Sequence, residues 1–308
     1  MDRFDQNWDE HYIRHGGGGS DSPTFYIIRR AIPDVGLFSN YIVFAGHIRY
    51  ALSKGWLPVV DMQNYPNAYL EPEQLGKVNA WEYYFCQPLG IGLETAYNGD
   101  NVILSNGGTH PFPSGNSDYF NDKDGVLTEW RMLVKLGLLK VQPKLYEEII
   151  SLREKLFAPE DRVLGVLMRG TDYVARRPYQ HPIQPPIEYA LTKIVEKLNE
   201  WRCNKIFLAT EDKFIAQTVK NLFGNFCVML DKEFIDYSGT KYISQFHTER
   251  ENDYYLKGKE YLTEMIILST CNCLVAGRTS GTNGVVMMKK FENIYTFNLG
   301  RYGVIGLD

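Results

Sequence analysis

The residues best suited to chemistry follow a short apolar segment near the middle of the chain. Residues 163–168 are almost continuously apolar, which is typical of a strand buried on both faces of a parallel sheet. Arg169, Gly170, Thr171 and Asp172 come directly after this segment. Open α/β sheets bind ligands at the carboxyl ends of their strands, and the planar guanidinium of arginine suits a phosphate. The pattern indicates either a phosphate site or, equally well, an Arg169–Asp172 ion pair that closes a loop.

Two further polar loops follow predicted strands in the second half of the chain. A strand at residues 206–209 leads into Glu211 and Asp212, and a strand at residues 273–276 leads into the segment 277–284. Because the carboxyl ends of parallel strands meet at one edge of a sheet, the three loops can converge on a single ligand. Such a convergence favours a nucleotide diphosphate.

The third loop, residues 277–284, is rich in glycine and hydroxyl side chains and precedes a predicted helix at residues 285–290. The free N–H groups and the dipole of a helix N-terminus favour an anion, and hydroxyl groups add donors. The loop lacks the Gly-Lys-Ser/Thr ending of a P-loop, and a capped tight turn explains its composition as well. The residues that would bind a diphosphate here are Thr279, Ser280, Gly281 and Thr282.

The elements expected to position these loops alternate between strands and helices. In the first half, a strand at residues 25–29 precedes a helix that begins at Ser39 or Asn40, and a strand at residues 57–61 follows. An aromatic segment at residues 79–85 also has a helical pattern. The second half repeats the alternation, which predicts doubly wound parallel sheets in an α/β protein.

The amino-acid composition and the positions of glycine and proline predict the domain boundaries. The glycine run at residues 16–19 predicts a flexible N-terminal segment over residues 1–23. Pro159 follows the last helical pattern of the first half. We therefore expect one α/β domain at residues 24–160 and a second at residues 161–308.

The overall composition is that of a soluble globular protein without a strong charge bias. The chain has 308 residues, 44% of them hydrophobic and 23% charged, with a net charge of −4. This charge argues against nucleic acid as a partner. The five cysteines include no CxxC pair, so we expect reduced core residues and no metal site. The N-terminus lacks a hydrophobic signal region, which predicts a cytoplasmic protein, and a lipid-linked substrate would still bring it to the inner membrane surface.

Four segments resemble motifs of the fucosyltransferase superfamily, which includes the alpha-1,2-, alpha-1,6- and protein O-fucosyltransferases. The segment from Gly36 to Asn40 (Gly-Leu-Phe-Ser-Asn) is similar to the family's Gly-x-Phe-Gly-Asn loop, and residues 167–172 resemble its His-x-Arg-Arg-Gly/Thr-Asp motif. Residues 207–212 are similar to its Tyr-Leu-Ala-Thr-Asp-Asp segment, and residues 264–280 resemble its Asp…Leu-Ser…Leu-Val-Cys-Thr-Phe-Ser-Ser stretch. The aromatic first half is most similar to bacterial polysaccharide-biosynthesis members.

The resemblance implies a GT-B-like pair of Rossmann-type domains, with the acceptor on the first and the nucleotide sugar on the second. It implies inverting transfer of a sugar, typically fucose, from a GDP-sugar substrate to a glycan or lipid-linked glycan, without a metal ion or other cofactor. Arg169 would stabilise the leaving GDP, Glu264 would hold the guanine and Asn40 would face the donor sugar. The implied nucleotide-sugar site comprises Gly36, Ser39, Asn40, Arg169, Gly170, Glu211, Asp212, Glu264, Thr279, Ser280, Gly281 and Thr282, with Arg169 and Asp172 as the catalytic residues.

The chain departs from the family at two positions and has no clear match to its general base. Leu167 stands where the family has His, and Gly170 stands where it has a second Arg, so the sequence leaves the base and the sugar of the donor open. Asp172 and His181 are the candidates for the general base, although His181 also fits an ordinary surface loop. The adjacent Arg176 and Arg177 fit either a phosphate-bearing acceptor or a solvated surface.

Two other interpretations remain at this stage. Asp122-Lys-Asp124 has the Asp-x-Asp form with which metal-dependent glycosyltransferases hold a divalent ion, but its Gly- and Asn-rich surroundings also suit a turn. A binding module for a nucleotide sugar or glycan that lost catalysis would explain the departures from the motifs.

Overall fold

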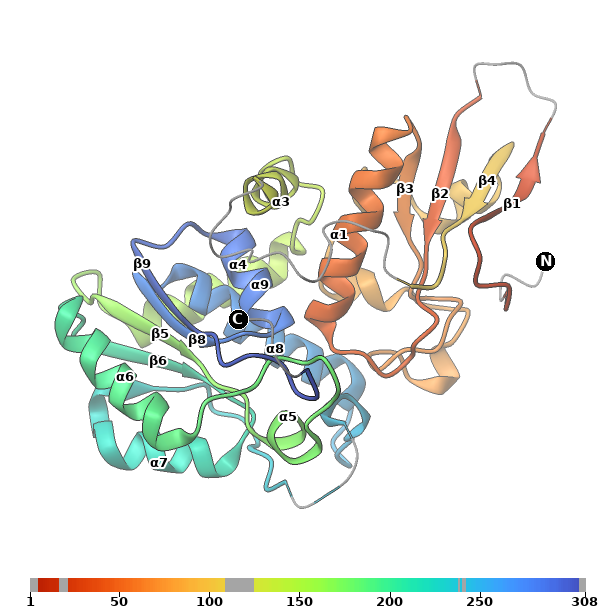
Figure 1. Cartoon of the computed structure of the whole chain (residues 1–308). Coiled ribbons are helices and arrows are strands. Elements are labelled where there is room, and N and C mark those ends of the chain that lie inside the picture. Colours follow the sequence, from red (N-terminus) through yellow and green to blue (C-terminus); the bar gives the residue numbers. More distant parts are fainter. Residues whose placement is uncertain (1–4, 17–21, 109–124, 238, 240–241, 305–308) are drawn as a thin grey trace. The chain divides into compact units, whose positions relative to one another are not determined.

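The structure, a computed structural model, describes residues 5–16, 22–108, 125–237, 239 and 242–304. The chain divides into two compact units. The first unit comprises residues 1–146 and 247–259, and the second comprises residues 147–246 and 260–308. Each unit contains one β-sheet with helices packed on it (Figure 1).

The sheet of the second unit is parallel throughout and has the strand order of a Rossmann domain. Its strands are β5 (Val163–Leu167), β6 (Lys205–Ala209), β7 (Cys227–Val228), β8 (Cys273–Gly277) and β9 (Asn293–Phe297), arranged in the order β7-β6-β5-β8-β9. From β5 the chain adds β6 and β7 on one side and then β8 and β9 on the other, so the strand order reverses between β5 and β8. Ligands of open α/β sheets bind outside the carboxyl ends of the strands at this reversal.

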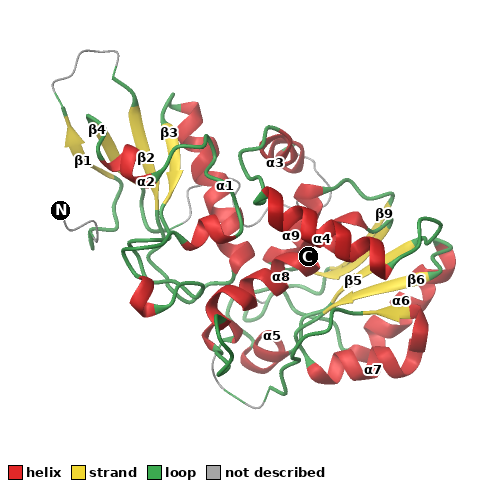
Figure 2. Cartoon of the chain, turned by 180° about the vertical axis from the view of Figure 1, so that it is seen from behind, coloured by secondary structure: helices red, strands yellow, loops and turns green. Residues whose placement is uncertain are grey.

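Helices cover both faces of this sheet (Figures 1 and 2). The helices of the unit are α4 (Pro143–Leu156), α5 (Thr171–Arg176), α6 (Ile187–Glu200), α7 (Lys213–Phe223), α8 (Asp253–Thr270) and α9 (Ser280–Met288). Ile194 of α6 and Val219 of α7 join the core on one face. On the other face α8 packs so closely that a Cβ at Gly165 would lie 3.0 Å from Leu268. A glycine in the central strand therefore allows this helix to approach.

The sheet of the first unit is mixed. It contains β1 (His11–His15), β2 (Thr24–Ile28), β3 (Leu57–Val60) and β4 (Asn101–Leu104) in the order β1-β4-β2-β3. Strand β2 runs parallel to β3 and β4, whereas β1 runs antiparallel to β4. Its helices are α1 (Leu37–Ser53), α2 (Leu93–Tyr97) and α3 (Val126–Lys135), and the beginning of α8 belongs to this unit up to Lys259. Within the described residues, none of the helices is long and apolar enough to span a bilayer.

The alternation of strands and helices expected from the sequence is confirmed, with corrections at the termini of elements. The expected flexible segment 1–23 contains β1, whose mostly polar residues hide the strand pattern until it pairs with β4. The aromatic segment 79–85 forms only a short 3-10 helix, Ala80–Tyr83. Helix α1 begins after Gly36 rather than at Ser39 or Asn40. Parallel sheets are therefore right for the second unit and for the centre of the first.

Helix α9 begins earlier than its sequence predicts. The residues at 280–284 have low helix propensity, so the expected start was residue 285. The Thr279 side chain caps the helix by accepting a hydrogen bond from the Thr282 N–H at 3.1 Å. A Cβ at Gly281 would lie 2.4 Å from the Tyr261 hydroxyl, so only a glycine allows this close packing. The cap and the close packing outweigh the low propensity.

Candidate functional site

The loops that follow β5 and β6 meet at the carboxyl edge of the second sheet, as expected. Glu211 accepts hydrogen bonds from the Thr171 hydroxyl at 2.7 Å and from the Gly170 N–H at 3.3 Å. Asp212 accepts one from the Thr171 N–H at 3.1 Å. The loop after β8 lies on the other side of β5, at the reversal of strand order. The sheet thus brings the three predicted loops to one edge.

Arg169 is the central cation of this edge. Its Nη2 lies 2.9 Å from Asp172 Oδ1 and its Nε lies 3.0 Å from Glu211 Oε1. The guanidinium also lies 4.9 Å from the centre of the Tyr173 ring. Burial alone would lower the pKa of Arg169, but Glu211 and Asp172 outweigh burial and raise it. Arg169 is therefore charged at every physiological pH, and the ion pair with Asp172 that the sequence allowed is present.

Both oxygens of Asp172 are engaged. Oδ1 accepts from Arg169 and from the Thr171 hydroxyl at 3.2 Å, and Oδ2 accepts from the Ile243 N–H at 3.3 Å. Asp172 remains a predicted catalytic residue, but these contacts favour a role in holding Arg169.

Asp212 explains why residue 170 is glycine. Oδ1 of Asp212 accepts from the Ile215 N–H at 2.9 Å and caps α7, while Oδ2 holds the Thr171 N–H. A Cβ at Gly170 would lie 2.2 Å from Oδ2. The second arginine of the family motif therefore has no room here, and the contacts that would have revealed this lie between separate loops.

The hydroxyl groups at the N-terminus of α9 stabilise the turn itself. The Thr279 and Thr282 hydroxyls lie 3.1 Å apart, and the Thr282 hydroxyl also donates to the Gly277 carbonyl. Both residues are buried, whereas Ser280 is half-buried. The capped turn that the sequence allowed is therefore present. An anion at this helix would meet mainly backbone N–H groups and the Ser280 hydroxyl.

Glu264 forms an ion pair that the sequence did not indicate. Its Oε1 lies 2.6 Å from Lys232 Nζ, and both side chains are almost fully buried. Burial raises the pKa of Glu264, and Lys232 opposes this effect. Lys232 comes from an irregular segment with no local pattern, so only the folded chain identifies it as a neighbour of the residue predicted to hold the base.

In the first unit, the predicted residues lie at the beginning of α1. Gly36 is the N-cap and has an extended backbone, and its carbonyl accepts from the N–H groups of Ser39 and Asn40. Asn40 is 1% exposed, and its Oδ1 has no hydrogen-bond partner among the described residues. A buried acceptor without a partner is unusual in a folded protein.

His181 and Arg176 form no ion pair with Arg169, Asp172 or Glu211 among the described contacts. His181 is exposed, and its ring packs edge-on at 5.4 Å against Tyr173, the ring that also contacts Arg169. Arg176 lies 4.1 Å from the centre of the Tyr242 ring. Asp122 and Asp124 lie outside the described residues.

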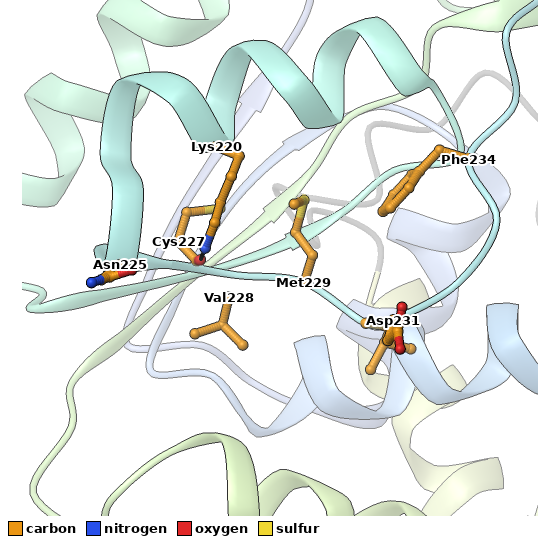
Figure 3. Close-up of a pocket in the computed structure, with 8 residues that line it drawn as sticks. Lys220, Asn225, Cys227, Val228, Met229, Asp231 and Phe234 are labelled. Carbon is orange, nitrogen blue, oxygen red and sulfur yellow. Dashed lines mark hydrogen bonds between the residues drawn. The ribbon is translucent and has the colours of Figure 1, made fainter.

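A cavity of about 420 Å³ lies at the β7 edge of the second sheet (Figure 3). Of its lining residues, Lys220 comes from α7, and Met229, Asp231 and Phe234 come from the segment after β7. The sequence-predicted site residues are not part of its lining. The cavity is therefore separate from the candidate site.

Comparisons with known proteins agree with the motifs. No protein-family model matches the chain, and no curated protein does. Several solved structures are similar over most of the chain, and three of them are described here. NodZ alpha-1,6-fucosyltransferase soaked with GDP-fucose has 16% identity, covering 91% of this chain and 97% of its own at a TM-score of 0.53. POFUT1 in complex with GDP-fucose has 10% identity, 91% and 99% coverage and a TM-score of 0.54.

The third structure is a mutant of Arabidopsis thaliana FUT1 in complex with GDP. It has 11% identity, 94% and 75% coverage and a TM-score of 0.53. Identities this low establish the fold and leave activity to be argued from the site. The chain has the GT-B-like α/β fold of fucosyltransferases, as its motifs predicted.

Proposed function

We propose that the protein is a glycosyltransferase that moves fucose from GDP-fucose to a glycan acceptor. The observation that carries this proposal is the position of Arg169. It lies at the carboxyl edge of a Rossmann sheet, where the strand order reverses and α9 begins, in a fold shared with fucosyltransferases whose structures contain GDP-fucose. A cation and a helix N-terminus at this position suit a diphosphate.

The proposed reaction is a direct displacement that inverts the anomeric carbon. The acceptor hydroxyl loses its proton to a base, for which Asp172 and His181 are the predicted candidates, and its oxygen forms a bond to the anomeric carbon. The bond between that carbon and the β-phosphate oxygen breaks, and its electron pair leaves with GDP. Arg169 and the N–H groups of α9 stabilise the charge that develops on the phosphate. Arg169 also positions the phosphate, because Asp172 and Glu211 fix its guanidinium from two sides.

The two carboxylates also limit how tightly the donor binds. A diphosphate competes with Asp172 and Glu211 for the same guanidinium, and like charges repel. Nη2 of Arg169 donates a hydrogen bond to Asp172, whereas its buried Nε lies 3.0 Å from Glu211 without hydrogen-bond geometry, so Nε is a donor without a hydrogen-bond partner among the described residues. For the guanine base, Glu264 would provide a hydrogen-bond acceptor and Lys232 a donor. In the first unit, Asn40 Oδ1 is an acceptor without a hydrogen-bond partner among the described residues.

The remaining parts of the proposal rest on the motif resemblance. The reaction would not require a metal ion, and the protein would act in surface polysaccharide synthesis. Residues 24–160 would form the acceptor domain and residues 161–308 the donor domain. A lipid-linked glycan acceptor would bring the protein to the cytoplasmic membrane surface. A metal-dependent transferase that uses Asp122 and Asp124 is the alternative that the motifs leave open.

The test is the thermal stabilisation of the full chain by GDP, GDP-fucose and UDP, each with and without EDTA. A ligand that binds only the native state stabilises it. We expect GDP and GDP-fucose to raise the melting temperature with or without EDTA, and the Arg169→Ala variant to show a smaller shift. Stabilisation by UDP alone that EDTA abolishes would replace this proposal with the metal-dependent alternative. If none of the three ligands shifts the melting temperature, the remaining interpretations are a transferase with a different donor and a binding module without catalysis.

A further inference from the structure

Arg30 is a cation of the first unit that the motifs do not explain. It follows the end of β2 by two residues, just as Arg169 follows the end of β5 by two residues. Strand β2 lies inside its sheet, parallel to β3 on one side and to β4 on the other. The chain adds β3 before β4, so the strand order reverses between β2 and β4. Arg30 is therefore placed at the edge where open α/β sheets bind ligands.

The guanidinium of Arg30 lacks the partners that Arg169 has. Its Nε is buried and has no hydrogen-bond partner among the described residues. Burial lowers the pKa of Arg30, and no carboxylate in the described part of the chain opposes this effect. The guanidinium of Arg169, by contrast, lies 2.9 Å from Asp172 and 3.0 Å from Glu211. Because a charge that is removed from water is normally paired with an opposite charge, Arg30 is an unusual residue.

The preceding residue, Arg29, is an arginine whose hydrogen bonding the first unit satisfies. Arg29 is fully buried, and its nitrogens donate to the carbonyl oxygens of Ser105 and Asp5 at 2.9 Å each and to the Tyr65 hydroxyl at 3.2 Å. The described residues provide no such set of acceptors for Arg30. The fold therefore uses Arg29 for its own stability and leaves Arg30 for another partner.

Asp34 is the carboxylate nearest to Arg30 in the sequence, in the loop 29–36 between β2 and α1. It is exposed, and its charge does not affect the pKa of Arg30. That charge acts instead on Lys257 and His247 of the same unit, where it favours their protonated forms. The carboxylate of the loop is therefore not the counter-ion of Arg30.

The helix that follows this loop also has unused hydrogen-bonding capacity. Gly36 is the N-cap of α1 and provides no side-chain cap, and the first turn of the helix contains no acidic residue. No carboxylate of that turn balances the positive end of the helix dipole. Asn40 Oδ1 and the Tyr41 hydroxyl belong to residues that are at most 1% exposed, and they have no hydrogen-bond partner among the described residues. Such atoms are rare in folded proteins, and here they occur within eleven residues of Arg30 in the sequence.

The chemistry of a guanidinium determines which ligand suits Arg30. Its planar donors match the two oxygens of a carboxylate or phosphate group, and hydrogen bonds between charged groups are stronger than those between neutral groups. In the proposed function the first unit binds the glycan acceptor. An acidic sugar combines an oxyanion with hydroxyl groups that donate and accept hydrogen bonds, whereas a neutral sugar would leave the charge of Arg30 without a partner.

We propose that Arg30 binds the carboxylate or phosphate group of an acidic glycan acceptor, an inference that rests on the proposed function. Arg30 holds the acidic group at the carboxyl edge of the first sheet, and Arg169 holds the donor diphosphate at the carboxyl edge of the second. Arg30 determines the specificity for the acceptor and takes no part in the chemical step. The substrate class of the enzyme is then a negatively charged glycan.

The test measures the binding of three small sugars to the full chain saturated with GDP, which occupies the Arg169 edge. The sugars are methyl β-D-glucuronide, galactose 1-phosphate and the neutral methyl β-D-glucoside, compared at equal ionic strength. We expect an anionic sugar, and not the glucoside, to raise the melting temperature further, and the one that does so identifies the acidic group. The Arg30→Met variant should bind this sugar about tenfold or more weakly, as measured from the concentration dependence of the shift, since a hydrogen bond between charged groups contributes that much.

Two further variants make the result specific to Arg30. Arg49→Met is the matched control, because it removes the same charge from an exposed ion pair with Glu129 in the same unit, and it should bind the anionic sugar like the wild type. Arg30→Lys keeps the charge and is the variant to use if Arg30→Met does not fold. It should also bind more weakly than the wild type, because an ammonium cannot hold both oxygens of an oxyanion in the planar geometry of a guanidinium.

Some outcomes would overturn the inference alone. These are a GDP-saturated chain that neither anionic sugar stabilises, equal stabilisation by the neutral glucoside, or binding of the anionic sugar that is unchanged in the folded Arg30 variant. A wild-type chain that neither GDP nor GDP-fucose stabilises would overturn the proposed function, and with it the assignment of the acidic sugar as a transfer acceptor.

Discussion

The two units of the chain compensate their buried cations in different ways. In the second unit, Arg169 is paired with two carboxylates and Lys232 with a third. In the first unit, Arg29 is fully buried and donates to carbonyl oxygens, among them those of Ser105 and Asp5 at 2.9 Å each. Its guanidinium also lies 4.9 Å from the centre of the Trp8 ring.

The difference matters for what each cation can bind. Neutral carbonyls and rings satisfy the donors of Arg29 completely, so this residue has a structural role. Carboxylates satisfy Arg169 as ions, and a phosphate is an equivalent partner that can compete with them. Glu211 and Asp172 raise the pKa of Arg169, whereas burial lowers that of Arg30 in the first unit.

The largest effect should come from breaking the buried pair of Lys232 and Glu264. The Lys232→Met variant leaves the Glu264 carboxylate buried without its cation, since only 4% of that side chain is exposed. Breaking such a pair costs about 3–5 kcal/mol of unfolding free energy. Urea denaturation measures this loss.

The matched control removes both charges of this pair. The double variant Lys232→Met/Glu264→Leu should recover most of the lost stability, because two apolar side chains can replace a buried ion pair at little cost. A single variant within about 1 kcal/mol of the wild type would show that water reaches Glu264. It would also weaken the contrast between the units.

The next largest effect should come from the removal of Arg169, and it should be an effect on activity. The Arg169→Ala variant should reduce turnover of GDP-fucose by about 10²–10³-fold, because one donor to the developing phosphate charge is lost. GDP release, measured on protein shown to be folded by circular dichroism, checks this. The control is Arg176→Ala, since Arg176 is exposed and packs on Tyr242. Turnover near the wild-type rate in a folded Arg169→Ala chain would remove Arg169 from the mechanism.

Substitution of Arg29 should change the stability of the protein only. The Arg29→Lys variant keeps the charge, but a single ammonium cannot reach Ser105 on one side and Asp5 on the other. The loss of one or two such hydrogen bonds should reduce the unfolding free energy by about 2–3 kcal/mol. GDP affinity of the folded protein should be unchanged. A tenfold change in that affinity at native stability would give Arg29 a role in binding.

Much of the second unit could be predicted because its signals are local. The apolar segment around Val166 requires a buried strand, and parallel topology then places the loops after β5, β6 and β8 at one edge. The family motifs lie in these loops, so the fold and the position of the candidate site followed together. The start of α9 was wrong because packing of Gly281 against Tyr261 overrides helix propensity.

The other features depend on contacts between distant segments. Nothing in the local pattern of residues 247–259 indicates that they fold with the first unit. The approach of Lys257 to His247 and of Lys232 to Glu264 appears only when these segments meet. Strand β1 likewise needs β4 as a partner. Sequence motifs therefore predicted the edge at which the donor is proposed to bind, whereas the contacts between distant segments came from the fold.

Substitution of Asp212 should have the smallest effect and is the most specific test. Its Oδ1 caps α7 through the Ile215 N–H, and its Oδ2 holds the Thr171 N–H in the loop after β5, so both oxygens already accept hydrogen bonds. The Asp212→Ala variant should lose about 1 kcal/mol of unfolding free energy, as for other helix caps. Asparagine caps helices equally well through its oxygen, but its amide nitrogen cannot accept a hydrogen bond from the Thr171 N–H, so Asp212→Asn should keep the cap, lose about 1 kcal/mol of unfolding free energy and keep GDP-fucose affinity. If the folded Asp212→Asn variant binds GDP-fucose tenfold more weakly, the carboxylate of Asp212 acts on donor binding. The second unit would then use its acidic residues for binding as well as for holding Arg169.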